Sequence, residues 1–201
     1  MASFCAGAAK GISLSNILPF GWVGQKVRLV PLDREKHFAN ALRWLNDPEV
    51  TRWLLVGDLP LTRIAEEAYF DRLADVGPPG EDPTEVGFAI ETLAEEHIGF
   101  TAIHHISFRH GAATTGTVIG RRSLWNRGFG SDAIRVRTRY AFDVLGLRLL
   151  LTEVFAENAG SLKALASNGY RELARIPQRW WKRGALRDVV LLALYRQDWQ
   201  D

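Results

Sequence analysis

The stretch between residues 115 and 155 constrains the fold of this chain more than any other part. It contains a strand-like run, a turn with two closely spaced glycines (Gly128 and Gly130), a strongly amphipathic helix that ends at Gly146, and an apolar strand-like run at 149–155. A strand, a helix and a second strand in this order predict a right-handed parallel crossover. We therefore expect an α/β fold with a mixed sheet.

The rest of the chain adds strands and helices to that unit. Strand patterns are found at 26–32, 86–92, 97–108, 113–120, 170–176 and 189–195, and helical patterns at 34–46, 62–74 and 161–167. Polar interruptions at 94–96 and 109–111 suit antiparallel hairpin turns. In the 62–74 helix, with Thr62 as its N-cap, the expected apolar side comprises Ile64, Ala68, Phe70 and Leu73. In the long helix the expected apolar stripe comprises Ala133, Val136, Tyr140, Ala141 and Val144.

Composition narrows the class of protein. A chain of 201 residues with 47% apolar and 24% charged residues is within reach of one globular domain. The net charge of +2 excludes a dedicated polybasic surface for nucleic acid or membrane, and no apolar run is long enough to span a bilayer. Cys5 is the single cysteine and no Cys/His cluster has zinc spacing, so we expect no metal and a cytoplasmic setting. Residues 1–25 are expected to form a flexible or loosely packed extension rather than a signal peptide.

The glycine turn suits a phosphate group. N–H groups at a helix start are unpaired, the helix dipole adds positive potential, and glycine lets the main chain approach an oxyanion. Arg121, Arg122 and Arg127 are near enough in sequence to hold outer phosphates. A Gly-x-Gly turn is also compatible with an ordinary tight turn. The fingerprint of dinucleotide-binding proteins would need a third glycine, and the Gly-Lys-Ser/Thr sequence of nucleotide-triphosphate-binding loops is absent. These two classes of cofactor are therefore disfavoured.

Two further sequence elements indicate a family. The first comprises Trp125, Gly128, Phe129, Gly130, Ser131, Asp132 and Ala133, and the second comprises Asn158, Ser161, Gly169 and Tyr170. Together they resemble the GNAT N-acetyltransferase superfamily, and specifically its branch similar to the RimJ/RimL ribosomal-protein acetyltransferases. The resemblance covers residues 26–197, which we take as one acetyltransferase domain.

This resemblance implies a GNAT fold: a mixed, mostly antiparallel twisted sheet of six to seven strands, flanked by helices, with a central splayed parallel pair. Main-chain groups of Val118, Ile119 and Gly120 would stay unpaired beside the gap and bind the pantetheine of acetyl-CoA. The turn would hold the pyrophosphate through Arg122, Arg127, Gly128, Phe129, Gly130 and Ser131. Asn158 and Ser161 would contact the pantetheine side.

The implied reaction moves an acetyl group from acetyl-CoA to a primary amine by direct attack in a ternary complex. Many superfamily members protonate the leaving thiolate with a tyrosine, but Leu165 stands at that position. The RimL-like branch suggests Ser161 instead, although a serine there is also compatible with a helix cap. For the general base, His104 and His105 are candidates and His105 is the residue we assign. Glu91 and Glu153 are weaker options that are more often solvated strand charges.

The acceptor stays open at this point, between a protein N-terminus and a small-molecule amine. Trp180 and Trp181 lie where the family commonly borders the acceptor site, and they suit either an aromatic wall or ordinary core packing. The missing tyrosine and the unassigned base motivate an alternative of another class, a catalytically weak acyl-CoA-binding regulatory module. A homodimer is possible, and a nucleic-acid or membrane partner is not expected.

Overall fold

The computed structural model describes residues 22–75, 77 and 80–200, so most of the expected 1–25 extension lies outside the described residues. The strands are β1 (Val27–Pro31), β2 (Val86–Thr92), β3 (His97–Ser107), β4 (Ala112–Ile119), β5 (Leu149–Phe155), β6 (Arg171–Lys182) and β7 (Ala185–Tyr195). The α-helices are α1 (Arg34–Leu45), α2 (Arg63–Ala74), α3 (Phe129–Arg139) and α4 (Ala159–Ala166). Short helical turns are η2 (Val50–Trp53), η3 (Arg122–Leu124), η4 (Tyr140–Val144) and η5 (Arg196–Asp198).

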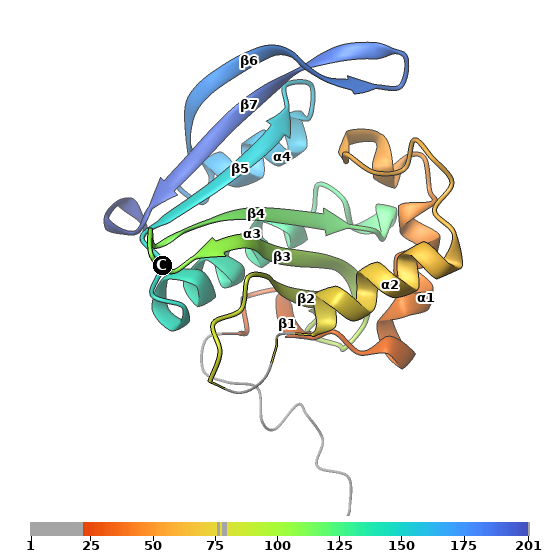
Figure 1. Ribbon diagram of the computed structural model, residues 1–201, viewed down its shortest axis with the longest axis horizontal. Helices are drawn as coiled ribbons and strands as arrows, with labels where there is room; N and C mark the ends of the chain where they lie inside the picture. Colours follow the sequence, from red (N-terminus) through yellow and green to blue (C-terminus); the bar gives the residue numbers. More distant parts are fainter. Residues whose placement is uncertain (1–21, 76, 78–79, 201) are drawn as a thin grey trace, which may run out of the picture.

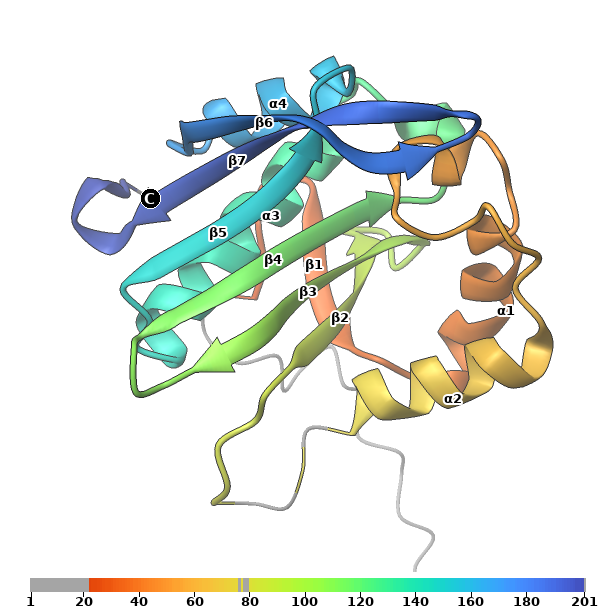
Figure 2. The same cartoon turned by 45° about the horizontal axis from the view of Figure 1, so that its top comes forward.

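The strands form one seven-stranded sheet in the order β1-β2-β3-β4-β5-β7-β6. Every neighbouring pair is antiparallel except β4 and β5, which are parallel. Figure 2 shows β4 and β5 side by side where they begin and diverging toward their arrowheads. The predicted mixed, mostly antiparallel sheet with a splayed parallel pair is confirmed.

Helices cover both faces of the sheet, with α1 and α2 on one side and α3 and α4 on the other (Figure 1). The larger apolar core joins the sheet to α3 and includes Ala133, Val136 and Phe142. A smaller cluster of Phe38, Ala41 and Phe70 lies under α1 and α2. No helix in the described part of the chain is long and apolar enough to cross a membrane.

Side-chain caps fix where three of the helices begin. Asp33 accepts a hydrogen bond from Lys36 N (3.0 Å) at α1, and Thr62 accepts one from Ala65 N (3.2 Å) at α2. At α4 the cap is Asn158, whose Oδ1 accepts from Ser161 N (3.1 Å). Thr62 was predicted correctly, whereas the interpretation of Ser161 as the cap is wrong.

Two helix faces differ from their predicted apolar stripes. On α2 the buried side chains are Glu66, Phe70 and Leu73, while Ile64 is 80% exposed. At the end of α3 the chain changes to a π-helical turn, η4, in which Leu145 N bonds to Tyr140 O. The extra residue in that turn shifts the helical phase, and Val144 is 56% exposed.

Candidate active site

A fork between β4 and β5 is the main irregularity of the sheet. The pairing of the two strands ends at Thr114 and Leu151. Two threonine side chains then bridge the strands, because Thr152 Oγ1 donates to Thr115 O (3.0 Å) and Thr115 Oγ1 to Leu151 O (3.3 Å). Beyond these bridges the strands part, which confirms the predicted V-shaped opening.

Main-chain groups of β4 past the fork point to opposite sides in alternation. Gly120 N donates to Ile98 O (2.9 Å) and Val118 pairs with Phe100, so both residues face β3. The prediction that the main chains of Val118 and Gly120 stay unpaired is therefore wrong. Because alternate residues of a strand face opposite neighbours, the groups of Thr117 and Ile119 face the gap. Ile119 O there accepts a hydrogen bond from Trp125 Nε1 (2.6 Å).

A buried arginine supports this free part of β4 from the α3 side. Arg137 is 1% exposed and donates to Thr117 Oγ1 (2.8 Å), to Gly116 O (3.3 Å) and to Tyr170 OH (3.1 Å). These partners are neutral, and they connect α3, β4 and the start of β6. The arginine thus keeps β4 in place where its pairing with β5 has ended.

The glycine turn lies at the start of α3. Gly128 is the N-cap residue with a left-handed φ of 85°, which a glycine adopts without strain. Asp132 N is the first N–H to bond within the helix, to Gly128 O (3.0 Å), so the N–H groups of Phe129, Gly130 and Ser131 precede the first helical bond. A Cβ added at Gly130 would meet only Ile119 Cγ1, at 3.5 Å.

Positive charge gathers around the turn. Lys26 Nζ donates to Arg127 O (3.1 Å) and lies 5.7 Å from the centre of the Phe129 ring. The Arg127 and Arg122 side chains are exposed, and Arg122 lies 4.0 Å from Asp47. An anion at the helix start would therefore meet main-chain N–H groups and three cationic side chains.

Two polar residues after the turn form hydrogen bonds to other parts of the chain. The Asp132 carboxylate accepts N–H bonds from Gln25 (3.2 Å), Lys26 (2.7 Å) and Val27 (3.0 Å), which fixes the start of β1. Ser131 Oγ is 3.0 Å from Ser167 Oγ and accepts from Asn168 Nδ2 (2.9 Å). The start of α3 is thus tied to β1 and to the end of α4.

At the other side of the fork, α4 follows β5. Ser161 is half-buried in its first turn, next to the Asn158 cap, and no hydrogen bond involves its hydroxyl among the described residues. Leu165 is buried in the core.

A cavity of about 490 Å³ lies on the α1/α2 face and reaches the fork. Gly116, Thr117 and Val118 of β4 line it, together with Glu153 and Phe155 of β5. The remaining walls are mostly apolar and come from α1, α2, β3 and the loop at 54–61, with Trp180 from the β6–β7 hairpin.

Three titratable groups on α2 and β3 line this cavity with shifted acidities. Burial raises the pKa of the Glu66 carboxyl to about 7 and raises the pKa of Tyr69. Burial also lowers the pKa of His104, against the opposing effect of Glu85, whose Oε1 is 3.5 Å from His104 Nδ1. Perturbed carboxyl and imidazole groups in a cleft are typical of a functional site.

Several residues singled out from the sequence take different places. His105 is exposed, with a φ of 51° and its Nδ1 2.9 Å from Thr114 Oγ1, and it is not among the residues that line the cavity. Trp181 is 67% exposed, and Trp180 lines the cavity and donates to Glu153 Oε2 (3.2 Å), so the core-packing interpretation of this pair is wrong.

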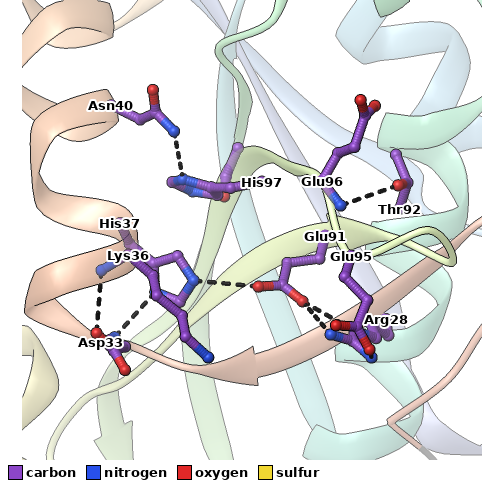
Figure 3. Close-up of polar contacts among 11 residues, drawn as sticks. Arg28, Asp33, Lys36, His37, Asn40, Glu91, Thr92, Glu95, Glu96 and His97 are labelled. Carbon is purple, nitrogen blue, oxygen red and sulfur yellow. Dashed lines mark hydrogen bonds and ion pairs between the residues drawn. The ribbon is translucent and has the colours of Figure 1, made fainter. Parts of the chain in front are cut away.

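Glu91 belongs to a separate polar cluster at the other edge of the sheet, shown in Figure 3. It bonds to Arg28 (2.6 Å) and lies 3.3 Å from His37 Nε2, so it is a buried ion-pair partner and not a solvated charge. His97 Nδ1 faces Asn40 Nδ2 (3.0 Å), and its Nε2 faces Gly99 O (3.0 Å). Since these groups satisfy one another, the cluster is structural.

Glu66 is the residue that sequence reasoning missed. A charged side chain on an amphipathic helix is ordinarily assigned to the solvent face. The available signal was its spacing, because Glu66, Phe70 and Leu73 lie at i, i+4 and i+7, which places all three on one side of a helix.

Comparisons with known proteins agree with this geometry. Residues 26–171 match the acetyltransferase (GNAT) domain family. The chain is 26% identical over 158 residues to the N-acetyltransferase p20 of Bacillus licheniformis, a stretch that covers 78% of this chain and 86% of that protein.

Solved structures share the fold. A spermidine N-acetyltransferase from Vibrio cholerae, in complex with CoA and spermine, matches 86% of this chain and 96% of its own with a TM-score of 0.75 and 18% identity. RimJ of Mycobacterium smegmatis, in complex with CoA-disulfide, matches 85% of this chain and 82% of its own with a TM-score of 0.72 and 20% identity. The family match extends over most of the described chain, and the protein belongs to the GNAT acetyltransferase family.

Proposed function

We propose that this protein transfers an acetyl group from acetyl-CoA to a primary amine. The observation that carries the proposal is the fork between β4 and β5, which lies between the glycine turn of α3 and the apolar cavity. One opening thus connects an anion site to a space for a second substrate, as a direct transfer between two bound substrates requires.

The residues present fit coenzyme A. The helix start at 129–131 offers N–H groups to a diphosphate, and Gly130 leaves open the space that a side chain would fill. Ile119 and Thr117 direct main-chain groups into the gap, where amide groups of a pantetheine arm can pair with them. Bound acetyl-CoA supplies the activated acetyl thioester.

Residues of the chain then serve the acceptor and the protons. In the balanced reaction the amine nitrogen bonds to the acetyl carbon and loses a proton to the base, the carbon–sulfur bond breaks, and the sulfur takes up a proton. The Ser161 hydroxyl is in our proposal the proton donor to that sulfur, with Asn158 holding the helix start beside it. Among the two histidines considered as base, His104 is favoured over His105 because it lines the cavity.

Replacing Gly130 with alanine tests the diphosphate site. Because the added methyl group meets only Ile119, at 3.5 Å, we expect a nearly unchanged melting temperature. The methyl group occupies the space that the diphosphate needs, so CoA affinity should fall on the order of 10- to 100-fold, as expected for lost charge-assisted hydrogen bonds. Isothermal titration calorimetry with CoA measures this change.

Pantetheine, which lacks the diphosphate, is the matched control ligand, and its binding should not change. Wild-type CoA affinity in the Gly130→Ala variant would contradict the site. If CoA binds tightly but no amine in a broad panel accelerates thiol release from acetyl-CoA, the protein is the regulatory module instead of an enzyme.

A further inference from the structure

Glu66 combines burial with a lack of partners. Its side chain lies on α2 and is 2% exposed, yet neither a hydrogen bond nor an ion pair to its carboxyl group occurs within residues 22–75, 77 and 80–200. A buried carboxylate without a partner is costly, because transfer from water is not offset by any bond. Such a group is stable in its charged form only when a cation is placed beside it.

The surroundings of Glu66 show where that cation would be. Glu66 lines the 490 Å³ cavity, whose nearby walls are aromatic or aliphatic, among them Tyr69, Phe70 and Phe100. The same cavity is lined by Gly116 and Thr117 at the fork. A molecule in the cavity can therefore contact Glu66 and the opening between β4 and β5.

We propose that the cavity binds a small apolar amine with a single amino group, and that the Glu66 carboxylate recognises this amino group. The inference rests on the proposed function, since it names the acceptor class of the same site. The acceptor's hydrocarbon or aromatic part contacts the apolar walls, and its nitrogen pairs with Glu66, the cavity-lining carboxylate that has no partner among the described residues.

The charges in the cavity disfavour a polyamine. Its two lining carboxylates are Glu66 and Glu153, and Glu153 already accepts from Trp180 Nε1 (3.2 Å) and pairs with Arg179 (3.4 Å). A polyamine would place further ammonium groups against apolar walls without a counter-ion, which is strongly unfavourable.

The walls also disfavour the N-terminal segment of a protein. A peptide carries an N–H and a C=O group at nearly every residue, and each needs a partner when it is buried. Few polar groups line this cavity apart from Glu66, Glu153, Thr101, Thr117, His104 and Tyr69. Its volume is within the range typical of small-molecule sites.

Binding of 2-phenylethylamine, without any CoA, tests the proposal. Trp53 and Trp180 line the cavity, so the quenching of tryptophan fluorescence reports its occupation. We expect 2-phenylethylamine to bind more tightly than spermidine. The Glu66→Gln variant should lose on the order of 10- to 100-fold in affinity for the amine, the range of a hydrogen bond to a charged group. Its affinity for the neutral isostere 2-phenylethanol should change less than about threefold.

Glu67→Gln is the matched control, because Glu67 lies on the same helix and pairs with Arg34 (2.9 Å) and Arg63 (3.1 Å) outside the cavity. It should bind the amine like the wild type. A measurement without variants is the pH dependence: burial raises the pKa of Glu66 to about 7, so the amine should bind more weakly as the pH falls below 7.

Tighter binding of spermidine, equal amine affinity of wild type and Glu66→Gln, or amine binding that does not weaken below pH 7 would each overturn the proposal. If CoA binds and spermidine or a peptide is acetylated while 2-phenylethylamine is not bound, the acceptor class is wrong and the proposed function stands. If CoA does not bind, the proposed function itself fails.

Discussion

Asp132 lies in the first turn of α3, beside the proposed diphosphate site, but its carboxylate is directed to β1. It accepts three main-chain N–H bonds, from Gln25, Lys26 and Val27. Gly24 lies against the same carboxylate, since a Cβ at that position would collide with Asp132 Oδ2. The acidic residue of the family motif therefore attaches the first strand to the helix that carries the turn.

Replacing Asp132 with alanine should lower the free energy of unfolding by about 3 kcal/mol, because three main-chain N–H groups, of which that of Val27 is buried, lose a charged acceptor. Urea denaturation measures this loss. Asp143→Ala is the matched control: Asp143 forms an exposed ion pair with Arg196 (2.8 Å), and its removal should cost less than about 1 kcal/mol. Equal effects of the two substitutions would show that the three bonds do not hold β1.

At the scale of elements, sequence patterns located the strands and helices well, but they predicted less well which face of each helix is buried. The turn at Gly128 and the parallel strands on either side of it could be predicted from the sequence, because a positive φ and a helix start need particular residues. The exposed side chains of Ile64 and Val144 do not follow from helical periodicity. The first depends on which side of α2 meets the cavity, and the second on a π-helical turn that changes the phase of the helix.

The end of β6 was also not predictable from the local sequence pattern. It extends to Lys182, beyond the predicted 170–176, because its partner β7 continues the pairing through Trp180–Arg187 and Lys182–Ala185. Pairing between distant strands of this kind is only weakly reflected in the alternation of apolar and polar residues along the sequence. The extended hairpin brings Trp180 to the cavity, so the proposed acceptor site could not be assembled from the sequence alone.

That hairpin also holds the loop at 54–61, four of whose residues line the cavity. Lys182 is 2% exposed, and its Nζ lies 2.7 Å from Asp58 Oδ1 and 2.8 Å from Val56 O. Lys182→Met keeps the aliphatic stem and removes the ammonium group. We expect faster proteolytic cleavage within the loop and weaker binding of the amine, on the order of 10-fold, because a charged group with two bonds is lost.

Lys163→Met is the control for this prediction, because Lys163 is an exposed lysine on α4 and is not among the residues that line the cavity. It should leave cleavage and amine affinity as in the wild type. If Lys182→Met behaves in the same way, the loop is held by its own packing and the hairpin does not close the cavity.

At the scale of the whole molecule, buried titratable groups on α1, α2 and β3 make stability depend on pH in opposite directions. Burial lowers the pKa of His97 to about 3 and lowers the pKa of His37 (Figure 3). Burial raises the pKa of Glu66 to about 7. A histidine that stays neutral in the folded state costs stability as the pH falls, because the unfolded chain takes up the proton first. For the carboxyl group the loss occurs as the pH rises from about 4.5 toward 7.

Burial is the main reason why His97 resists protonation, and the contact with Asn40 acts in the same direction. Arg43 donates to Asn40 Oδ1 (2.8 Å), which turns the Asn40 amide so that its Nδ2 donates to His97 Nδ1 (3.0 Å), and a proton on Nδ1 would oppose that donor. Between pH 6.5 and 5, His97 alone should therefore remove about 2 kcal/mol from the free energy of unfolding. Urea denaturation at these two values should show that His97→Gln has lost this part of the acid sensitivity. Glu66→Gln should instead gain stability over the wild type progressively as the pH rises from about 4.5 to 7, with the full gain above pH 7. An acid slope that His97→Gln leaves unchanged would mean that His97 is protonated in the folded protein.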